Sequence, residues 1–199
     1  VEAIAALAFA EMLESGFTHV GEFHYLHHAP GGAAYANVAE LAERIAAAAA
    51  VTGIGLTLLP VCYAHGGFGG AAPTAGQVRF LSRTPDDYAR LHEASRRAIA
   101  PMDDAVIGIA PHSLRAVTPE ELAAILPLAK NGPVHIHAAE QVQEVEDCVG
   151  WCGARPVEWL IDHAPLSERW SVIHATHLNP HETGRLARSG AVVGLCPLT

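Results

Sequence analysis

Residues 133–148 read PVHIHAAEQVQEVEDC and contain one complete unit of the fold. A short apolar run at residues 134–137 ends on His137, and polar residues follow it directly. From Val142 onward the apolar residues recur at helical spacing. The stretch therefore predicts a buried strand, a polar loop and a helix, in that order.

The same unit recurs along the whole chain. Helix start signals stand between the apolar runs, where Thr84, Thr118 and Asn179 each precede a proline. The runs are nearly continuous and rich in β-branched or aliphatic residues, which is typical of parallel strands covered on both faces. The predicted strands are residues 18–23, 55–61, 106–110, 134–137, 171–174 and 191–195. This order predicts an α/β fold with a parallel sheet and right-handed crossovers.

The number of strands favours a barrel over an open sheet. No GxGxxG follows the first strand, which argues against a dinucleotide-binding fold. Six strands in 199 residues make about three quarters of a typical (β/α)8 TIM barrel. No linker divides the chain, so we expect residues 1–199 to form a single incomplete barrel domain. Because Val1 lies inside an amphipathic pattern and Thr199 directly follows an apolar run, we expect a piece of a longer chain.

Composition excludes several classes of function. The net charge is -9 with only 12 basic residues, which argues against nucleic-acid binding. No apolar run approaches the roughly 20 residues that span a bilayer, so no membrane segment is predicted. The four cysteines form no CxxC pair and indicate free thiols in a reducing, cytoplasmic compartment, although Cys148 and Cys152 are spaced to share a helix face. The 13 histidines raise the expectation of a metal or acid–base site.

Polar residues follow four of the predicted strands at the point where each strand ends. The carboxyl ends of parallel barrel strands carry the active site, so these residues predict a pocket for a small-molecule substrate. They are His24 and Tyr25 after the first strand, His112 and Arg115 after the third, His137 and Glu140 after the fourth, and His174 after the fifth.

The residue types suggest roles within this pocket. His137 with Glu140 three residues later fits a zinc ligand with a carboxylate that activates water, although a structural histidine explains the spacing equally well. His135 shares the strand face of His137 and is either a second ligand or a core residue. Arg115 presents a planar fork suited to a substrate carboxylate. His174 is placed to donate a hydrogen bond inside the mouth of the barrel.

Several segments together resemble the formimidoylglutamate deiminases, a family within the amidohydrolase superfamily. The resemblance runs along essentially the whole chain in the same order. It rests most specifically on GIAPHSLRAV (108–117) and HIHAAEQ (135–141), with GFTHVGEFHYLHH (16–28) and VIHATHL (172–178) in support. It implies a zinc-dependent (β/α)8 barrel of which this chain forms about strands two to seven.

The resemblance also implies a role for each candidate residue. His137 corresponds to a zinc ligand and His135 to a core residue, Glu140 to the acid that shuttles a proton, and His174 to a group near the hydrolytic water. His112, Arg115 and, less directly, Tyr25 correspond to residues that hold the substrate carboxylates. The family's HxH on the first strand and Asp on the eighth are absent here, so we expect the 199 residues alone to be inactive.

The implied reaction converts N-formimidoyl-L-glutamate and water into N-formyl-L-glutamate and ammonia, which is a step of histidine degradation. The resemblance is also compatible with a complete enzyme that is a homodimer. Two alternatives stay open. One is a related deaminase that acts on a purine-like heterocycle, for which Arg115 is not needed. The other is a barrel remnant that binds or assembles without catalysis.

Overall fold

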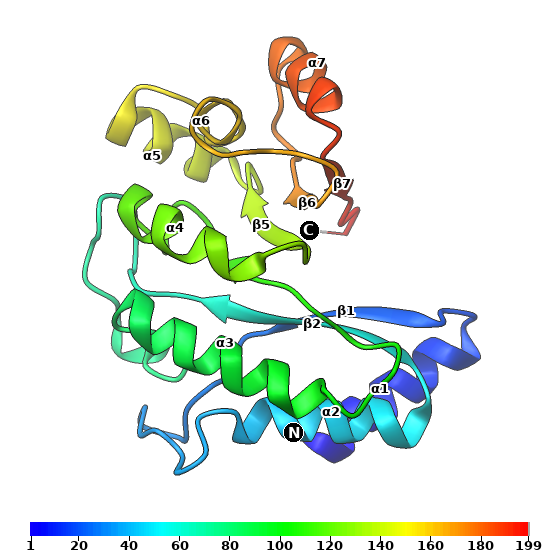
Figure 1. Cartoon of the computed structure of the whole chain (residues 1–199). Helices are drawn as coiled ribbons and strands as arrows, with labels where there is room; N and C mark the ends of the chain where they lie inside the picture. The colour runs from blue at the N-terminus through cyan, green and yellow to red at the C-terminus, as the bar shows by residue number, and fades with distance from the viewer. Residues whose placement is uncertain (199) are drawn as a thin grey trace.

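The computed structural model describes residues 1–198 as strands alternating with helices (Figure 1). The strands are β1 (His19–His24), β2 (Gly55–Cys62), β3 (Val106–Ile107), β4 (Ala110–Pro111), β5 (Val134–Ala138), β6 (Trp170–His174) and β7 (Val192–Gly194). The α-helices are α1 (Glu2–Glu14), α2 (Glu40–Thr52), α3 (Pro85–Ile99), α4 (Pro119–Ile125), α5 (Val142–Cys152), α6 (Pro156–His163) and α7 (Pro180–Ser189). Two 3₁₀ helices are η1 (Ala75–Gln77) and η2 (Leu126–Ala129).

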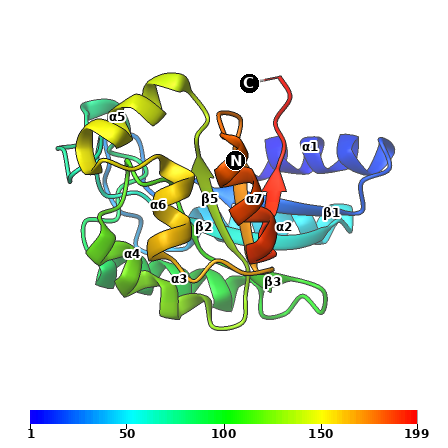
Figure 2. The same cartoon turned by 90° about the horizontal axis from the view of Figure 1, so that it is seen from above.

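All strand pairs among residues 1–198 are parallel. β1 pairs with β2, β2 pairs with β3 and β4, and β5, β6 and β7 pair in order. Single bridges from Ile109 to Val134 and from Ser113 to His137 join the two groups. The predicted α/β fold with a parallel sheet is confirmed. Seen from above, α5 and α1 lie on opposite sides of the strands (Figure 2).

The third predicted strand, residues 106–110, is wrong as one continuous strand. β3 and β4 are separate, because the chain changes partner between them: Gly108 N–H donates to the Leu58 carbonyl of β2, and Ile109 N–H donates to the Pro133 carbonyl before β5. A side chain at position 108 would lie 2.5 Å from the Pro133 oxygen. Glycine therefore permits the close approach that splits the strand.

The predicted helix starts are confirmed. The Thr84 hydroxyl accepts a hydrogen bond from Asp87 N–H at the start of α3. Thr118 and Asn179 form capping boxes with glutamates at the third helical position of α4 and α7. These caps satisfy amide groups that the first helical turn leaves without partners. They fix where each helix leaves the carboxyl end of its strand.

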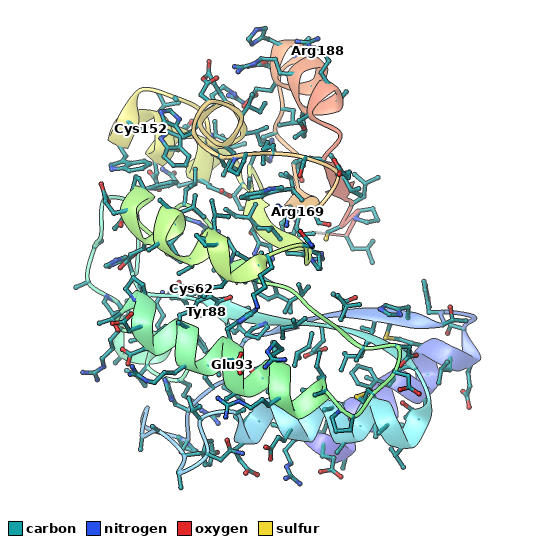
Figure 3. The ribbon with its side chains drawn as sticks, in the orientation of Figure 1. Cys62, Tyr88, Glu93, Cys152, Arg169 and Arg188 are labelled. Atoms are coloured by element: carbon teal, nitrogen blue, oxygen red, sulfur yellow. The ribbon has the colours of Figure 1, made fainter. Side chains whose placement is uncertain are left out.

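The core lies between the strands and the helices that cover them. In β2, Leu56, Leu58, Leu59 and Val61 have no exposed surface. Tyr88 of α3 is also fully buried and donates a hydrogen bond of 2.8 Å to the Pro60 carbonyl of β2. Figure 3 shows Tyr88 beside Cys62, where α3 meets this strand. Burial of this kind contributes about 25 cal/mol for each Å² of apolar surface.

The predicted pairing of Cys148 and Cys152 on one helix face is confirmed. Both lie on α5, with their sulfur atoms 4.0 Å apart. Cys148 is buried and Cys152 is exposed at the outer side of the helix (Figure 3). Within residues 1–198, none of the helices combines the length and the apolar character that a bilayer crossing requires.

Candidate active site

Four predicted site residues from four segments form a continuous row of rings at the carboxyl ends of the strands. The ring centroids of Tyr25 and His112 are 5.5 Å apart, those of His112 and His137 are 5.0 Å apart, and those of His137 and His174 are 5.3 Å apart. The parallel order of β1, β2, β4, β5 and β6 brings their ends to one edge, so residues up to 149 positions apart in the chain meet there.

His137 presents a neutral ring with one nitrogen available as a ligand. Its Nδ1 lies 2.9 Å from the His112 carbonyl oxygen. A carbonyl only accepts, so Nδ1 carries the proton and Nε2 carries the lone pair. Burial lowers the pKa of His137, although the bond to His112 and the charge of Glu140 oppose the shift. A neutral imidazole fixed by a backbone carbonyl is the usual state of a histidine that binds a metal.

Phe23 of β1 fixes the His137 ring from the other side. The two ring centroids are 4.6 Å apart at an interplanar angle of 81°, an edge-on contact. Phe23 is not among the site residues predicted from the sequence. Its place on the predicted first strand, two residues before Tyr25, is the only signal that could have found it.

His135 lies on the same strand face, one step before His137. Its Cε1 would be 3.7 Å from a Cβ atom placed on Gly21, so the His135 ring lies against β1. Burial, followed by the proximity of His137, lowers the pKa of His135 to about 4. His135 is half-buried and stays neutral near pH 7.

Glu140 and His174 approach each other at the ends of β5 and β6. The Glu140 Oε1 lies 3.6 Å from the His174 Nε2, and His174 is 7% exposed. His174 and Ala175 have φ angles of +70° and +49°, which non-glycine residues rarely adopt. Such strain costs on the order of 1–3 kcal/mol and persists where the surroundings hold it. Here a hydrogen bond of 3.0 Å from Ala175 N–H to the Ala138 carbonyl holds the turn.

Arg115 brings a positive charge to the same place. Its Nη2 lies 3.8 Å from Glu140 Oε2 and 4.0 Å from Glu144 Oε2. Its Nε is buried and makes no hydrogen bond within residues 1–198. A buried donor without a partner suits the binding of an anion.

Tyr25 and His112 continue the polar wall. The Tyr25 hydroxyl lies 3.4 Å from His112 Nε2, and Ser113 Oγ lies 2.9 Å from His112 Nδ1. Burial, then the proximity of His137 and Arg115, lowers the pKa of His112 to about 3. Neutral His112 can therefore donate through one nitrogen and accept through the other.

Two further histidines, His24 at the end of β1 and His27 in the loop that follows, lie apart from this row. His24 and His27 are each 3% exposed with ring centroids 5.3 Å apart, and His27 Nε2 donates to the Val61 carbonyl. Burial lowers the pKa of His24 to about 4, and burial followed by its histidine neighbours lowers that of His27 to about 3. Both are buried groups at the end of β1 and in the loop after it.

The residues present fit one position of a metal site. His137 has the donor nitrogen, the neutral state and the orienting carbonyl that a ligand needs. Among residues 1–198, no three His, Cys, Asp or Glu side chains gather closely enough to hold a metal ion. A catalytic zinc site takes three protein ligands and a water, and His137 could supply one of these ligands.

The comparisons with known proteins agree with one family. The model of the amidohydrolase family matches residues 1–199. A formimidoylglutamate deiminase from Pseudomonas aeruginosa is 48% identical over 98% of this chain and 43% of its own length. The crystal structure of an amidohydrolase from Brucella melitensis superposes with a TM-score of 0.97 at 57% identity, over 99% of this chain and 44% of that one.

A further solved structure is more distant. An adenosine deaminase from Xanthomonas campestris with bound zinc has a TM-score of 0.75 and 25% identity, over 97% of this chain and 38% of that one. The chain thus spans less than half the length of the relatives that it matches.

Proposed function

The chain belongs to the amidohydrolase family, and on that premise we propose that it forms one side of the active site of a zinc-dependent deiminase. In this proposal its strands are barrel strands two to seven of eight, with β3 and β4 together as one strand. The remaining zinc ligands belong to barrel strands outside residues 1–199, and these residues alone do not turn over substrate. The complete gene product that contains them is the enzyme.

The proposed reaction is hydrolytic deimination of N-formimidoyl-L-glutamate. Water adds to the formimidoyl carbon, the terminal C–N bond breaks, and N-formyl-L-glutamate and ammonia leave. The observation that carries the proposal is the meeting of a proton-transfer pair, Glu140 and His174, with the guanidinium of Arg115 3.8 Å from Glu140. The similarity to a formimidoylglutamate deiminase supports the same substrate.

His137 is the residue of this chain that would hold the zinc. When bound, zinc would lower the pKa of a water ligand toward about 7 and so supply a nucleophile at neutral pH. Glu140 is placed to accept the proton of the attacking water and to return it to the departing nitrogen. His174 lies at the end of the neighbouring strand, where it orients the water and stabilises the tetrahedral intermediate.

Arg115 binds a carboxylate of the glutamyl part, with His112 and Tyr25 beside it. The buried Nε of Arg115 supplies the donor for this anion. Binding at the carboxylates is remote from the reacting carbon, so its effect is to fix that carbon near Glu140.

A second candidate function is deamination of a purine-like heterocycle. The similarity to an adenosine deaminase favours it. The two functions differ in their need for Arg115, because a neutral base offers no carboxylate to a guanidinium. If the protein has a non-catalytic role instead, neither substrate is turned over.

Ammonia release by the zinc-loaded complete gene product separates these functions. We expect turnover of N-formimidoyl-L-glutamate and a loss of about 100-fold or more in kcat/KM for Arg115→Ala, since buried charge-assisted contacts of this kind contribute about 3 kcal/mol. Arg97→Ala on α3 is the matched control, because the Arg97 side chain is 70% exposed and pairs with Glu93 on the same helix. Turnover of guanine or adenosine that is insensitive to Arg115→Ala would favour the purine deaminase instead.

A further inference from the structure

Glu144 is a buried carboxylate that the mechanism above does not use. It is the third residue of α5, and its side chain is 2% exposed. Oε1 accepts a hydrogen bond of 3.1 Å from Ala139 N–H, and Oε2 accepts one of 3.0 Å from Glu140 N–H. A buried carboxylate requires such partners, and here both are amides of the loop that carries Glu140.

Ordinary helix capping does not account for these bonds. Glu121, Glu158 and Glu182 also occupy the third position of their helices, and each accepts from the amide of its own N-cap residue. The N-cap of α5 is Gln141, yet Glu144 bonds the two residues before it. Its carboxylate therefore reaches back beyond the helix start into the catalytic loop.

The loop needs this support. Ala139 has a φ angle of +54°, a conformation that a residue with a side chain rarely adopts. That turn directs the Glu140 side chain toward His174. Glu144 also lies 4.0 Å from the Arg115 guanidinium, whose Nη2 is 3.8 Å from Glu140. One buried carboxylate thus contacts both the loop of the proton-transfer group and the cation beside it.

We propose that Glu144 is a positioning residue, which fixes Glu140 through the two loop amides and anchors Arg115 opposite it. The inference rests on the proposed function, in which Glu140 transfers the proton. Glutamine at position 144 keeps the volume but turns an amide NH₂ toward one of the two N–H donors, so one bond is lost. Because a misplacement of about 1 Å can cost about 100-fold in rate, the loss falls mainly on kcat.

The test compares Glu144→Gln and Glu144→Ala with Glu158→Gln in the zinc-loaded complete gene product. Glu158 is the matched control, since it caps α6 from the same helical position and is not part of the candidate site. Steady-state ammonia release gives kcat and KM. Hydrogen exchange of the Ala139 and Glu140 amides reports the clamp itself, and circular dichroism confirms that each variant is folded.

We expect both Glu144 variants to lower kcat about 10- to 100-fold with KM changed less than about threefold, and to speed exchange of the two amides at least about tenfold. The Glu158→Gln enzyme should stay within about twofold of the wild type in kcat and KM. Folded Glu144 variants with unchanged kcat, or with unchanged exchange at both amides, would overturn the proposal. If the wild-type enzyme does not act on N-formimidoyl-L-glutamate, the proposed function fails, while amide exchange still decides whether Glu144 holds the loop.

Discussion

The Glu140 carboxylate lies 3.6 Å from the His174 imidazole, although the two residues leave different strands and are 34 positions apart. β5 and β6 are parallel and in register from Val134 and Trp170 to Ala138 and His174. Their carboxyl ends therefore deliver an acid and an imidazole to the same point. A proton can pass between solvent-derived water and a leaving group only where such groups converge.

Glu140→Gln should abolish most of the chemistry without removing the binding site. Glutamine fills the same volume but cannot accept the proton of the attacking water, so we expect kcat to fall about 100- to 10,000-fold with a much smaller change in KM. Steady-state kinetics of ammonia release measure both constants. Glu146→Gln on the exposed face of α5 is the control and should match the wild type. A Glu140→Gln enzyme with more than about a tenth of the wild-type kcat would exclude general-base catalysis by this residue.

His137 and His135 should differ in their effect on metal content. His137 has its Nδ1 hydrogen-bonded to a carbonyl and its Nε2 available, whereas the His135 ring lies against Gly21 of β1. We expect His137→Asn to lower the zinc content of the purified complete gene product from about one ion to about a tenth of that, because one ligand of a catalytic site is lost. His135→Asn should retain zinc. Elemental analysis after gel filtration measures the zinc content. Equal loss of zinc in both variants would contradict the role of His137 as the ligand and of His135 as a non-ligand.

Arg155→Ala should be strongly destabilising. Arg155 Nε donates at 2.7 Å to Glu182, whose side chain is 1% exposed, so the substitution leaves a buried carboxylate without its cation. Breaking a buried ion pair in this way costs about 3–5 kcal/mol. Urea unfolding of the complete gene product gives the change in the free energy of unfolding.

The matched control for Arg155 is Arg185→Ala, which breaks an ion pair to the more exposed Asp162 on the neighbouring helix. Exposed pairs contribute about 0–1 kcal/mol, so this variant should unfold nearly as the wild type does. Equal effects of the two substitutions would show that the burial of Glu182 does not determine the loss of unfolding free energy.

Acid should destabilise the folded protein through His24 and His27. Their pKa values in the folded protein are about 4 and about 3, below the ordinary value near 6.5 that applies when unfolded. Below pH 6.5 the unfolded state therefore binds more protons, and the free energy of unfolding falls as the pH falls toward 4. Each histidine should account for about 1 kcal/mol between pH 6 and pH 5.

Urea unfolding at pH 6 and pH 5 checks this dependence. His27→Gln removes one titrating group and should reduce the loss of stability between the two pH values, whereas His181→Gln at an exposed position of α7 should leave it unchanged. An identical loss in the wild type and the His27→Gln protein would show that His27 does not carry the effect.

Much of the fold followed from local signals that the structure retains. The apolar runs near residues 55–61 and 134–137 are buried strands, and the Thr-Pro and Asn-Pro pairs begin helices at Pro85, Pro119 and Pro180. The split at Gly108 could not be predicted from the local sequence. It depends on a change of hydrogen-bond partner from Leu58 to Pro133, and both partners are far from Gly108 along the chain.

The candidate site could be predicted from the sequence only in part. Polar residues follow the predicted strands at the point where each strand ends, and this pattern predicted that His112, His137 and His174 would meet. Their rings lie in one row. Phe23 and Glu144 were missed because an apolar strand residue and a helical glutamate look ordinary without their contacts. Glu144 matters through two backbone amides, and backbone partners leave no mark in a sequence.

The identity of the products tests the central claim most directly. The complete gene product, loaded with zinc, is incubated with N-formimidoyl-L-glutamate in ¹⁸O-labelled water, and the products are resolved by mass spectrometry. If Glu140, His174 and Arg115 act as proposed, ammonia and N-formyl-L-glutamate appear in equal amounts, the formyl oxygen carries the label, and Glu140→Gln suppresses both products. Formamide with free glutamate, which requires cleavage of the other C–N bond, or no product at all would contradict the account.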